Sequence, residues 1–405
     1  MGGLFESFLF TPEASETLGD LHVVDCMLRI EAALARAQAS AALIPQEAAQ
    51  SIIGTCKVEL FDVPKLVRES ARTRCLATPL VASLRETVAL FNPQAASYVH
   101  LGCSDHDLVN TALILVMRDM LKCIELELGR TTEALLAMAG PHADTAMLHR
   151  QSAPHCGITS FGLVCCQWAA PLVQCQRRLS SASRTQRLDL GRDLPSLLDM
   201  QGKAPLVMAL MAADLQLLPP SAAHPGSLDS MALACELGLL VGSLGKLVAD
   251  MSPLLQLDIS ELTPSASAPT LAAGLKPVFP MPAAMLCGVA QSAAQRVPQQ
   301  VATLLATLSQ DNSPTPGSWQ TRLTQWPALL TASHGISQAV AQLTTGLQAD
   351  MARMRSNLDA ARASVSAADA KARFSTGLMQ QAATLARSDL AALRACQAAA
   401  AGPQD

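Results

Sequence analysis

The chain has 405 residues, of which 50% are hydrophobic, 15% charged and 3% aromatic, and its formal net charge is −4. Without a sustained basic run, this balance gives nucleic-acid binding no electrostatic support. A composition dominated by Ala, Leu, Gln and Met favours helices packed on helices, over two or three domains or one elongated helical body.

Twelve cysteines are scattered along the chain without C-x-x-C spacing, and the N-terminus, M-G-G-L-F-E-S-F-L-F, lacks the basic region of a secretory signal. These features predict reduced thiols in a cytoplasmic protein. The most apolar stretches, 157–175 and 237–257, contain polar or charged residues such as Gln167 and Lys246. We therefore expect buried bundle helices and no membrane span.

Neither a metal nor a cofactor is expected. The neighbouring His142, His149 and His155 have no Cys or carboxylate partner at ligand spacing except Cys156, and adjacent residues rarely bind one ion. The sequence also has no Gly-rich phosphate loop, nucleophile elbow or nucleotide fingerprint.

In chain order, residues 1–100 are predicted to form a helical N-terminal domain. Leu18–Ala41 has helical apolar spacing, Pro45 opens a second short helix, and Asp62-Val63-Pro64 begins a third. No strand-rich domain and no internal repeat is predicted anywhere in the chain.

Residues 101–335 are predicted to form a central domain built around a long helical bundle. Asp105–Ala139 is expected to be one helix, ended by Gly140-Pro141. Two further long helices, over 160–181 and 229–257, support the bundle. The stretch 263–284 contains five prolines and is expected to be a loop.

Helix is predicted again over 283–308 and over Ile336–Ala363, and a last amphipathic segment over Ala367–Ala401. Residues 336–405 thus form a short C-terminal helical segment. The fold class is all-α, in three segments.

The polar stretch that leads into the first long helix is the best candidate for a functional site. His100, Ser104 and His106 lie within seven residues, and Asp107 and Thr111 follow on the first helical turns. Free N–H groups and the positive end of the helix dipole suit an anion-binding or acid–base site. The same residue types also suit an ordinary N-cap, and both interpretations stay open.

This stretch, Y-V-H-L-G-C-S-D-H-D-L-V-N-T-A-L-I-L, resembles the Y-V-H-x-G-A-T-S-Q-D-x-x-D-T-A-x-x-L signature of the aspartase/fumarase superfamily, in the form found in 3-carboxy-cis,cis-muconate cycloisomerases. Ile30–Ala49 is similar to the family's first helix pair. Gly242–Lys246 with Asp250 is similar to its third bundle helix, and Gly317-Ser318-Trp319 to its later G-A-W.

The resemblance implies a three-segment all-helical fold and a homotetramer whose active sites each combine three subunits. It implies a small dicarboxylate or tricarboxylate substrate, converted through a carbanion stabilised by its own carboxylate. Such chemistry needs a proton-transfer group and several fixed donors. The cycloisomerase closes a lactone by adding one of the substrate's carboxylates across a double bond, as part of aromatic-compound degradation by the β-ketoadipate pathway.

The carboxylate-binding positions depart from the family pattern more than the scaffold does. In the first segment Ser104 and Asp107 are kept, whereas Asp105 adds a negative charge where an anionic substrate is expected. In the second segment, His149 to Gly162, Arg150 and Gly162 are kept and His155 is new.

The third segment, Ala272 to Pro282, loses more. Ala273 and Gly274 replace two serines, one of which is the family's base. Phe279 and Met281 replace a lysine and an asparagine that bind substrate, and Lys276 lies near the missing lysine.

Three hypotheses follow: a cycloisomerase of the β-ketoadipate pathway, a catalytically inactive homologue acting as a structural or regulatory subunit, and a lyase of the superfamily with another substrate. The candidate site consists of three catalytic residues and five substrate-binding residues. The catalytic candidates are His155, His106 and Lys276, and the substrate-binding candidates are His100, Ser104, Asp107, Thr111 and Arg150. His155 and Lys276 are also open to interpretation as solvated loop residues.

Overall fold

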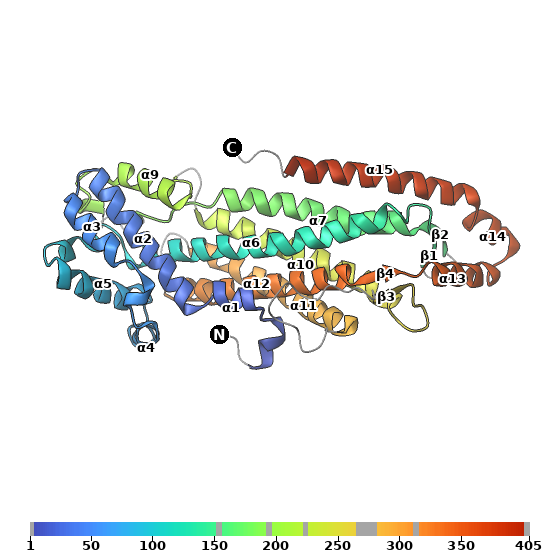
Figure 1. Cartoon of the computed structure of the whole chain (residues 1–405), viewed down its shortest axis with the longest axis horizontal. Coiled ribbons are helices and arrows are strands. Elements are labelled where there is room, and N and C mark those ends of the chain that lie inside the picture. Colours follow the sequence, from blue (N-terminus) through green and yellow to red (C-terminus); the bar gives the residue numbers. More distant parts are fainter. Residues whose placement is uncertain are drawn as a thin grey trace. The chain divides into compact units, whose positions relative to one another are not determined.

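A computed structural model describes residues 4–150, 156–191, 197–221, 226–264, 282–310 and 316–400, and its helices confirm the all-α fold class (Figure 1). The chain divides into two compact units. Unit 1 comprises Met1–Cys123, Ser181–Cys235 and Ala302–Leu330, and unit 2 comprises Ile124–Ser180, Glu236–Val301 and Thr331–Asp405. The division into segments 1–100, 101–335 and 336–405 stays a prediction, because the two units group residues by contact and not by order along the chain.

Unit 1 contains the short helices of the N-terminal region together with α9 and η4 from later in the chain. They are α1 (Pro12–Thr17), α2 (Asp20–Ser40), α3 (Gln46–Thr55), α4 (Val63–Thr73), α5 (Ala77–Phe91) and α9 (Ala204–Leu215), with the 3-10 helices η1 (Leu4–Leu9), η2 (Val58–Leu60), η3 (Ala95–Tyr98) and η4 (Thr307–Gln310). α2 packs against α3 and α9 through its buried apolar face, which includes Leu28, Ile30 and Leu34.

Five longer helices carry residues of both units: α6 (Asp105–Ala139), α7 (Phe161–Arg184), α10 (Gly226–Leu254), α11 (Ala283–Ala306) and α12 (Pro316–Thr345). α6 has the predicted bounds. Within unit 1 it buries Leu108, Leu115 and Met120 completely. It is followed by the turn at Gly140-Pro141, where proline cannot continue a helix.

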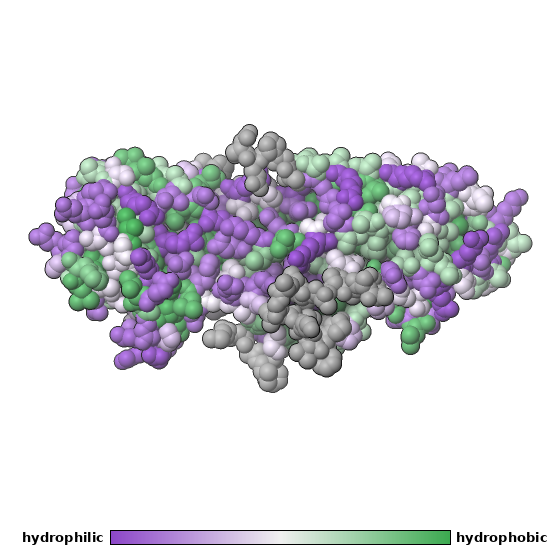
Figure 2. All heavy atoms as spheres, viewed as in Figure 1, coloured by the Kyte–Doolittle hydropathy of each residue, from purple (hydrophilic) through white to green (hydrophobic). Residues whose placement is uncertain are grey.

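Among the described residues, one helical stretch, Leu228–Leu254 of α10, is long and apolar enough to cross a membrane, and half of its most apolar window is buried inside the protein. A buried core helix passes the same test of length and composition. In the part of α10 that belongs to unit 2, Lys246 donates to Asp250 at 2.5 Å, and Asp250 also accepts a hydrogen bond from Trp168. On the face drawn in Figure 2, hydrophilic residues are interspersed with hydrophobic ones.

The described part of unit 2 contains four short strands that periodicity did not predict. β1 (Ala146–His149) and β2 (Gly157–Ser160) pair antiparallel, with Met147 opposite Thr159. β3 (Leu262–Pro264) and β4 (Leu347–Ala349) form a second antiparallel pair. Strands of three or four residues are too short to show an alternating pattern.

The prediction of one helix over Ile336–Ala363 is wrong, because the chain leaves helical conformation after α12. It passes through β4, and α13 (Met351–Ala363) then begins behind Asp350, whose carboxylate accepts the Arg353 N–H at 2.9 Å. Gly346 and Asp350 were the available signals for this break. The predicted tail helix is also divided, into α14 (Ala367–Arg373) and α15 (Thr376–Ala400).

Candidate functional site

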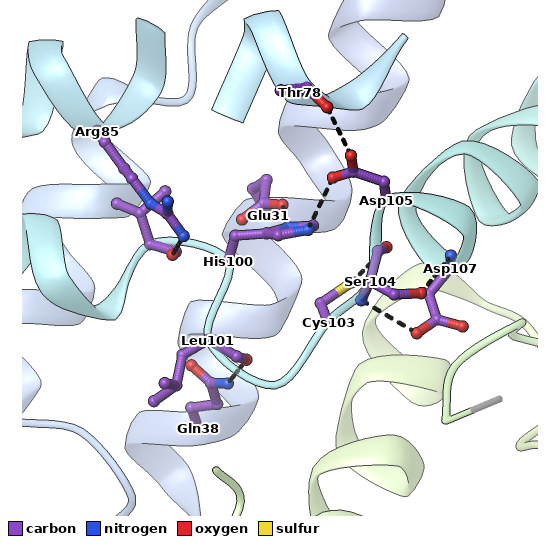
Figure 3. Close-up of polar contacts among 11 residues, drawn as sticks. Glu31, Gln38, Thr78, Arg85, His100, Leu101, Cys103, Ser104, Asp105 and Asp107 are labelled. Atoms are coloured by element: carbon purple, nitrogen blue, oxygen red, sulfur yellow. Dashed lines mark hydrogen bonds and ion pairs between the residues drawn. The ribbon is translucent and has the colours of Figure 1, made fainter. Parts of the chain in front are cut away.

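The loop before α6 is held in place by side chains from two other helices of unit 1. Gln38 of α2 donates to the Leu101 carbonyl at 2.6 Å, and Arg85 of α5 donates to the Val99 carbonyl at 3.2 Å (Figure 3). His100 and Gly102 have φ angles of 62° and 68°. A left-handed conformation is uncommon for a residue other than glycine, so surrounding contacts have to hold His100 there.

The His100 imidazole lies between two carboxylates. Its Nδ1 is 2.5 Å from Glu31 Oε1, and its Nε2 is 3.6 Å from Asp105 Oδ1 (Figure 3). Burial lowers the pKa of His100, but Glu31 and Asp105 together outweigh burial and raise it to about 9. The ring is therefore an imidazolium at neutral pH, and it offsets one of the two negative charges.

Asp105 has protein partners for its added negative charge. Its Oδ2 accepts hydrogen bonds from Thr78 Oγ1 at 2.6 Å and from Cys75 Sγ at 3.1 Å. The interaction with His100, with help from these donors, lowers the pKa of Asp105 against the opposing effect of burial. The carboxylate expected to repel an anionic substrate thus forms part of an internal ion-pair cluster.

Ser104 and Asp107 form a capping box at the start of α6. The Asp107 N–H donates to Ser104 Oγ at 3.2 Å, and the Ser104 N–H donates to Asp107 Oδ2 at 3.2 Å. Burial raises the pKa of Asp107, although bonds from Ser104 and the Gly191 backbone act to lower it. The N-cap interpretation of these two residues accounts for their contacts.

The next turn of α6 is linked to two other parts of unit 1. Asn110 accepts from Trp319 Nε1 at 2.9 Å and donates to Asp189 Oδ2 at 2.9 Å, and Thr111 donates to the Asp189 carbonyl at 3.0 Å. The exposed His106 ring packs against Trp319, with ring centroids 4.4 Å apart.

Five of the predicted site residues therefore lie in one region of unit 1: His100, Ser104, His106, Asp107 and Thr111. Sequence reasoning missed Glu31 and Asp189 as their partners. Glu31 lies among apolar residues of a predicted helix. Because a buried carboxylate needs a partner, its position was the available signal for a polar contact there.

Arg150 lies in unit 2, directly after β1, and forms a two-pronged pair with Glu261. Its two terminal nitrogens lie 2.8 and 2.5 Å from the two oxygens of Glu261, whose side chain is fully buried. Asn357 donates to Glu261 Oε1 at 2.9 Å as well. The guanidinium predicted to bind substrate is engaged by a protein carboxylate in this structure.

The two remaining candidates, His155 and Lys276, lie outside the described residues, as do Ala273, Gly274 and Phe279. Their catalytic roles, and the substrate-binding roles of the other candidates, stay predictions.

Comparison with known proteins identifies relatives over most of the chain. Residues 12–191 match a family described as lyase. The 3-carboxy-cis,cis-muconate cycloisomerase of Bradyrhizobium diazoefficiens is 34% identical over 345 residues, which cover 84% of this chain and 76% of that protein. The enzyme of the same name from Pseudomonas putida is 34% identical over 363 residues, covering 88% of this chain and 84% of that protein.

A solved structure agrees with these sequence relatives. The 3-carboxy-cis,cis-muconate lactonizing enzyme from Pseudomonas putida has a TM-score of 0.82 and 27% sequence identity, over 98% of this chain and all of that one. With this identity and this coverage, the chain belongs to the 3-carboxy-cis,cis-muconate cycloisomerase family of the aspartase/fumarase superfamily.

Proposed function

We propose that the protein is an isomerase of the cycloisomerase type, which closes a lactone within a carboxymuconate. The observation that carries this proposal is the 34% identity to a 3-carboxy-cis,cis-muconate cycloisomerase over 84% of the chain. The reaction forms one C–O bond and adds one proton to the neighbouring carbon, so it needs a proton donor and groups that stabilise a carbanion.

His155 is our candidate for the proton-transfer group, since imidazole titrates near neutral pH. Lys276 supplies a positive charge in the loop that lacks the family's lysine. In unit 1, Ser104 and Asp107 are the family residues kept at the start of α6, and a substrate oxygen would have to compete with their mutual hydrogen bonds for the Ser104 hydroxyl. His106, two residues after Ser104, is exposed, and its ring packs against Trp319.

The test is to incubate purified protein with 3-carboxy-cis,cis-muconate and to follow the loss of diene absorbance. We expect turnover, and we expect His155→Ala to abolish it. His149→Ala, which changes an exposed histidine on β1, is the matched control and should retain the rate. No turnover at high enzyme concentration would overturn the proposal, and an unchanged rate in His155→Ala would remove His155 from the mechanism.

A second candidate is a non-catalytic subunit, and the pairing of charged groups favours it. Arg150, which the resemblance assigns to substrate binding, is engaged by the buried Glu261 carboxylate. The third segment also has Phe279 and Met281 where the family has substrate-binding residues. Co-expression with an active paralogue should then give mixed oligomers, and recovery of homomers only would count against this candidate.

We also propose a cytoplasmic homotetramer. The twelve cysteines are free thiols, which supports a reducing compartment. Light scattering during gel filtration should give about four times the chain mass of 42.5 kDa. A monomeric mass would contradict this assembly.

A further inference from the structure

Three metal-ligating side chains come together in unit 1, apart from the candidate residues of the family site. His22 and Cys26 are one turn apart on α2, and Asp119 belongs to α6. Their ligand atoms, an imidazole nitrogen, a thiol sulfur and a carboxylate oxygen, all lie within 4.8 Å of one another. Residues four apart share one face of a helix, which explains how α2 presents both side chains to α6.

Two of the three spacings match the edges of a zinc tetrahedron, and the third, between Cys26 Sγ and the Asp119 oxygen, lies within 4.8 Å. Zinc binds sulfur at about 2.3 Å and nitrogen or oxygen at about 2.0–2.1 Å, so tetrahedral angles put sulfur and nitrogen about 3.6 Å apart and nitrogen and oxygen about 3.4 Å apart. Cys26 Sγ is 3.6 Å from His22 Nε2, and His22 Nε2 is 3.4 Å from Asp119 Oδ2. His22 therefore lies at ligand spacing from both Cys26 and Asp119.

The geometry also distinguishes an ion site from a catalytic Cys–His–Asp triad. In a triad the carboxylate bonds one imidazole nitrogen and the nucleophile bonds the other. Here the thiol and the carboxylate both face Nε2 of His22. Three atoms that converge on one point are the arrangement that a shared cation requires.

Charge and access are compatible with a divalent ion. A thiolate, a carboxylate and a neutral imidazole carry two negative charges in total, which balance Zn²⁺. The side chains of His22 and Asp119 are 27% and 21% exposed, so water can reach the fourth position. Lys122 contacts the other carboxylate oxygen, Oδ1, at 2.7 Å, and leaves Oδ2 to the ion.

We propose that His22, Cys26 and Asp119 bind one Zn²⁺ ion, with water as the fourth ligand. This site departs from the expectation of no metal, which considered only the histidines near residue 150. Without an ion, burial raises the pKa of the Cys26 thiol to about 12, and zinc binding must displace its proton.

The test uses full-length protein that has been dialysed against a chelator and then titrated with Co²⁺, a spectroscopic substitute for Zn²⁺. We expect one ion per chain and a thiolate-to-cobalt charge-transfer band that Zn²⁺ removes. Cys26→Ser should abolish the band, and His22→Ala and Asp119→Asn should each weaken binding at least about tenfold. Cys396→Ser, at a partly buried thiol of unit 2, is the matched control and should change nothing.

A second readout covers the case in which Cys26→Ser fails to fold. Zn²⁺ should raise the unfolding temperature of the wild-type protein more than that of Asp119→Asn or His22→Ala, since their altered side chains are partly exposed and easier to accommodate. Absence of a charge-transfer band at saturating Co²⁺ would overturn the proposal. So would a band that persists in folded Cys26→Ser, because the ion would then be bound elsewhere.

Discussion

At the scale of single residues, the best-defined polar feature of the described chain is the group formed by the buried Glu31 and His100 side chains and the partly exposed Asp105 carboxylate. A fully buried carboxylate is costly unless a charged partner lies close to it, and the His100 imidazolium meets this need for Glu31. The left-handed backbone at His100 is consistent with a residue held by its side-chain partners.

This group makes stability depend on pH in the alkaline range. The pKa of His100 is about 9 in the folded protein, above its ordinary value of 6.5. Its contribution to folding stability is therefore complete below about pH 6.5 and is lost as the pH rises through 9. The difference in pKa corresponds to about 3 kcal/mol of unfolding free energy. The pKa of Asp105 is lowered in the folded protein, so Asp105 stabilises the fold at pH values above its ordinary pKa of 3.8. This stabilisation is lost in acid.

Glu31→Gln should therefore flatten the alkaline limb of the stability curve. We expect the loss of unfolding free energy between about pH 6 and pH 10 to be roughly halved, because Asp105 still faces the ring. Urea unfolding at both pH values measures this, with the exposed Glu47→Gln as control. Parallel curves for wild type and Glu31→Gln would show that this pair does not set the pH dependence.

At the scale of elements, the start of α6 depends on Ser104. Its Oγ accepts the Asp107 N–H, which otherwise lacks an intrahelical partner. Ser104→Ala should cost about 1 kcal/mol of unfolding free energy, and Ser104→Thr should restore most of it. Denaturant unfolding tests this, with Ser97→Ala as a control at an exposed hydroxyl. Equal stability of wild type and Ser104→Ala would remove the capping role.

The Arg150–Glu261 pair predicts an asymmetric response to mutation. Arg150→Met should cost about 3–5 kcal/mol, since it strands the fully buried Glu261 carboxylate. Glu261→Gln should cost less, because Arg150 is partly exposed and can reach water. The exposed pair Arg394–Glu133 is the control, and Arg394→Met should cost at most about 1 kcal/mol. Equal losses in Arg150→Met and Glu261→Gln would contradict this account.

Elements were predictable from sequence where one strong rule acts over many residues. The apolar repeat from Leu108 onward fixes α6, and Gly140-Pro141 fixes its end. The break before α13 was not predicted, because it rests on a three-residue strand and on one capping carboxylate, Asp350. Partners distant in sequence, such as Glu261 for Arg150, follow from the fold and not from local pattern.

The candidate site was predictable only in part, for a related reason. The polar stretch before α6 showed that donors and acceptors gather there, and the structure places Ser104 and Asp107 as a cap. Local sequence could not show that Thr78 of α5 would donate to Asp105, or that Glu31 of α2 would bind the other side of the His100 ring. The apparent clash between Asp105 and an anionic substrate came from reading that charge without its partners.

At the scale of the whole molecule, the resemblance implies that different subunits supply the segments of one active site. Under that arrangement, two inactive variants can complement each other. His155→Ala and Lys276→Ala lie in different segments, so co-expressing the two chains with different affinity tags should give mixed tetramers in which about one quarter of the sites keep both residues. We expect carboxymuconate turnover to return to roughly that fraction of the wild-type rate.

Controls separate this recovery from other causes. Each variant expressed alone should be inactive. When a chain that carries both substitutions is co-expressed with the wild-type chain, the activity should not exceed that expected from the fraction of wild-type chains. If both residues come from one subunit, mixed tetramers of the single variants stay inactive, because no chain then contains a complete site. Inactive mixed tetramers beside an active wild type would therefore place His155 and Lys276 of one site in the same chain.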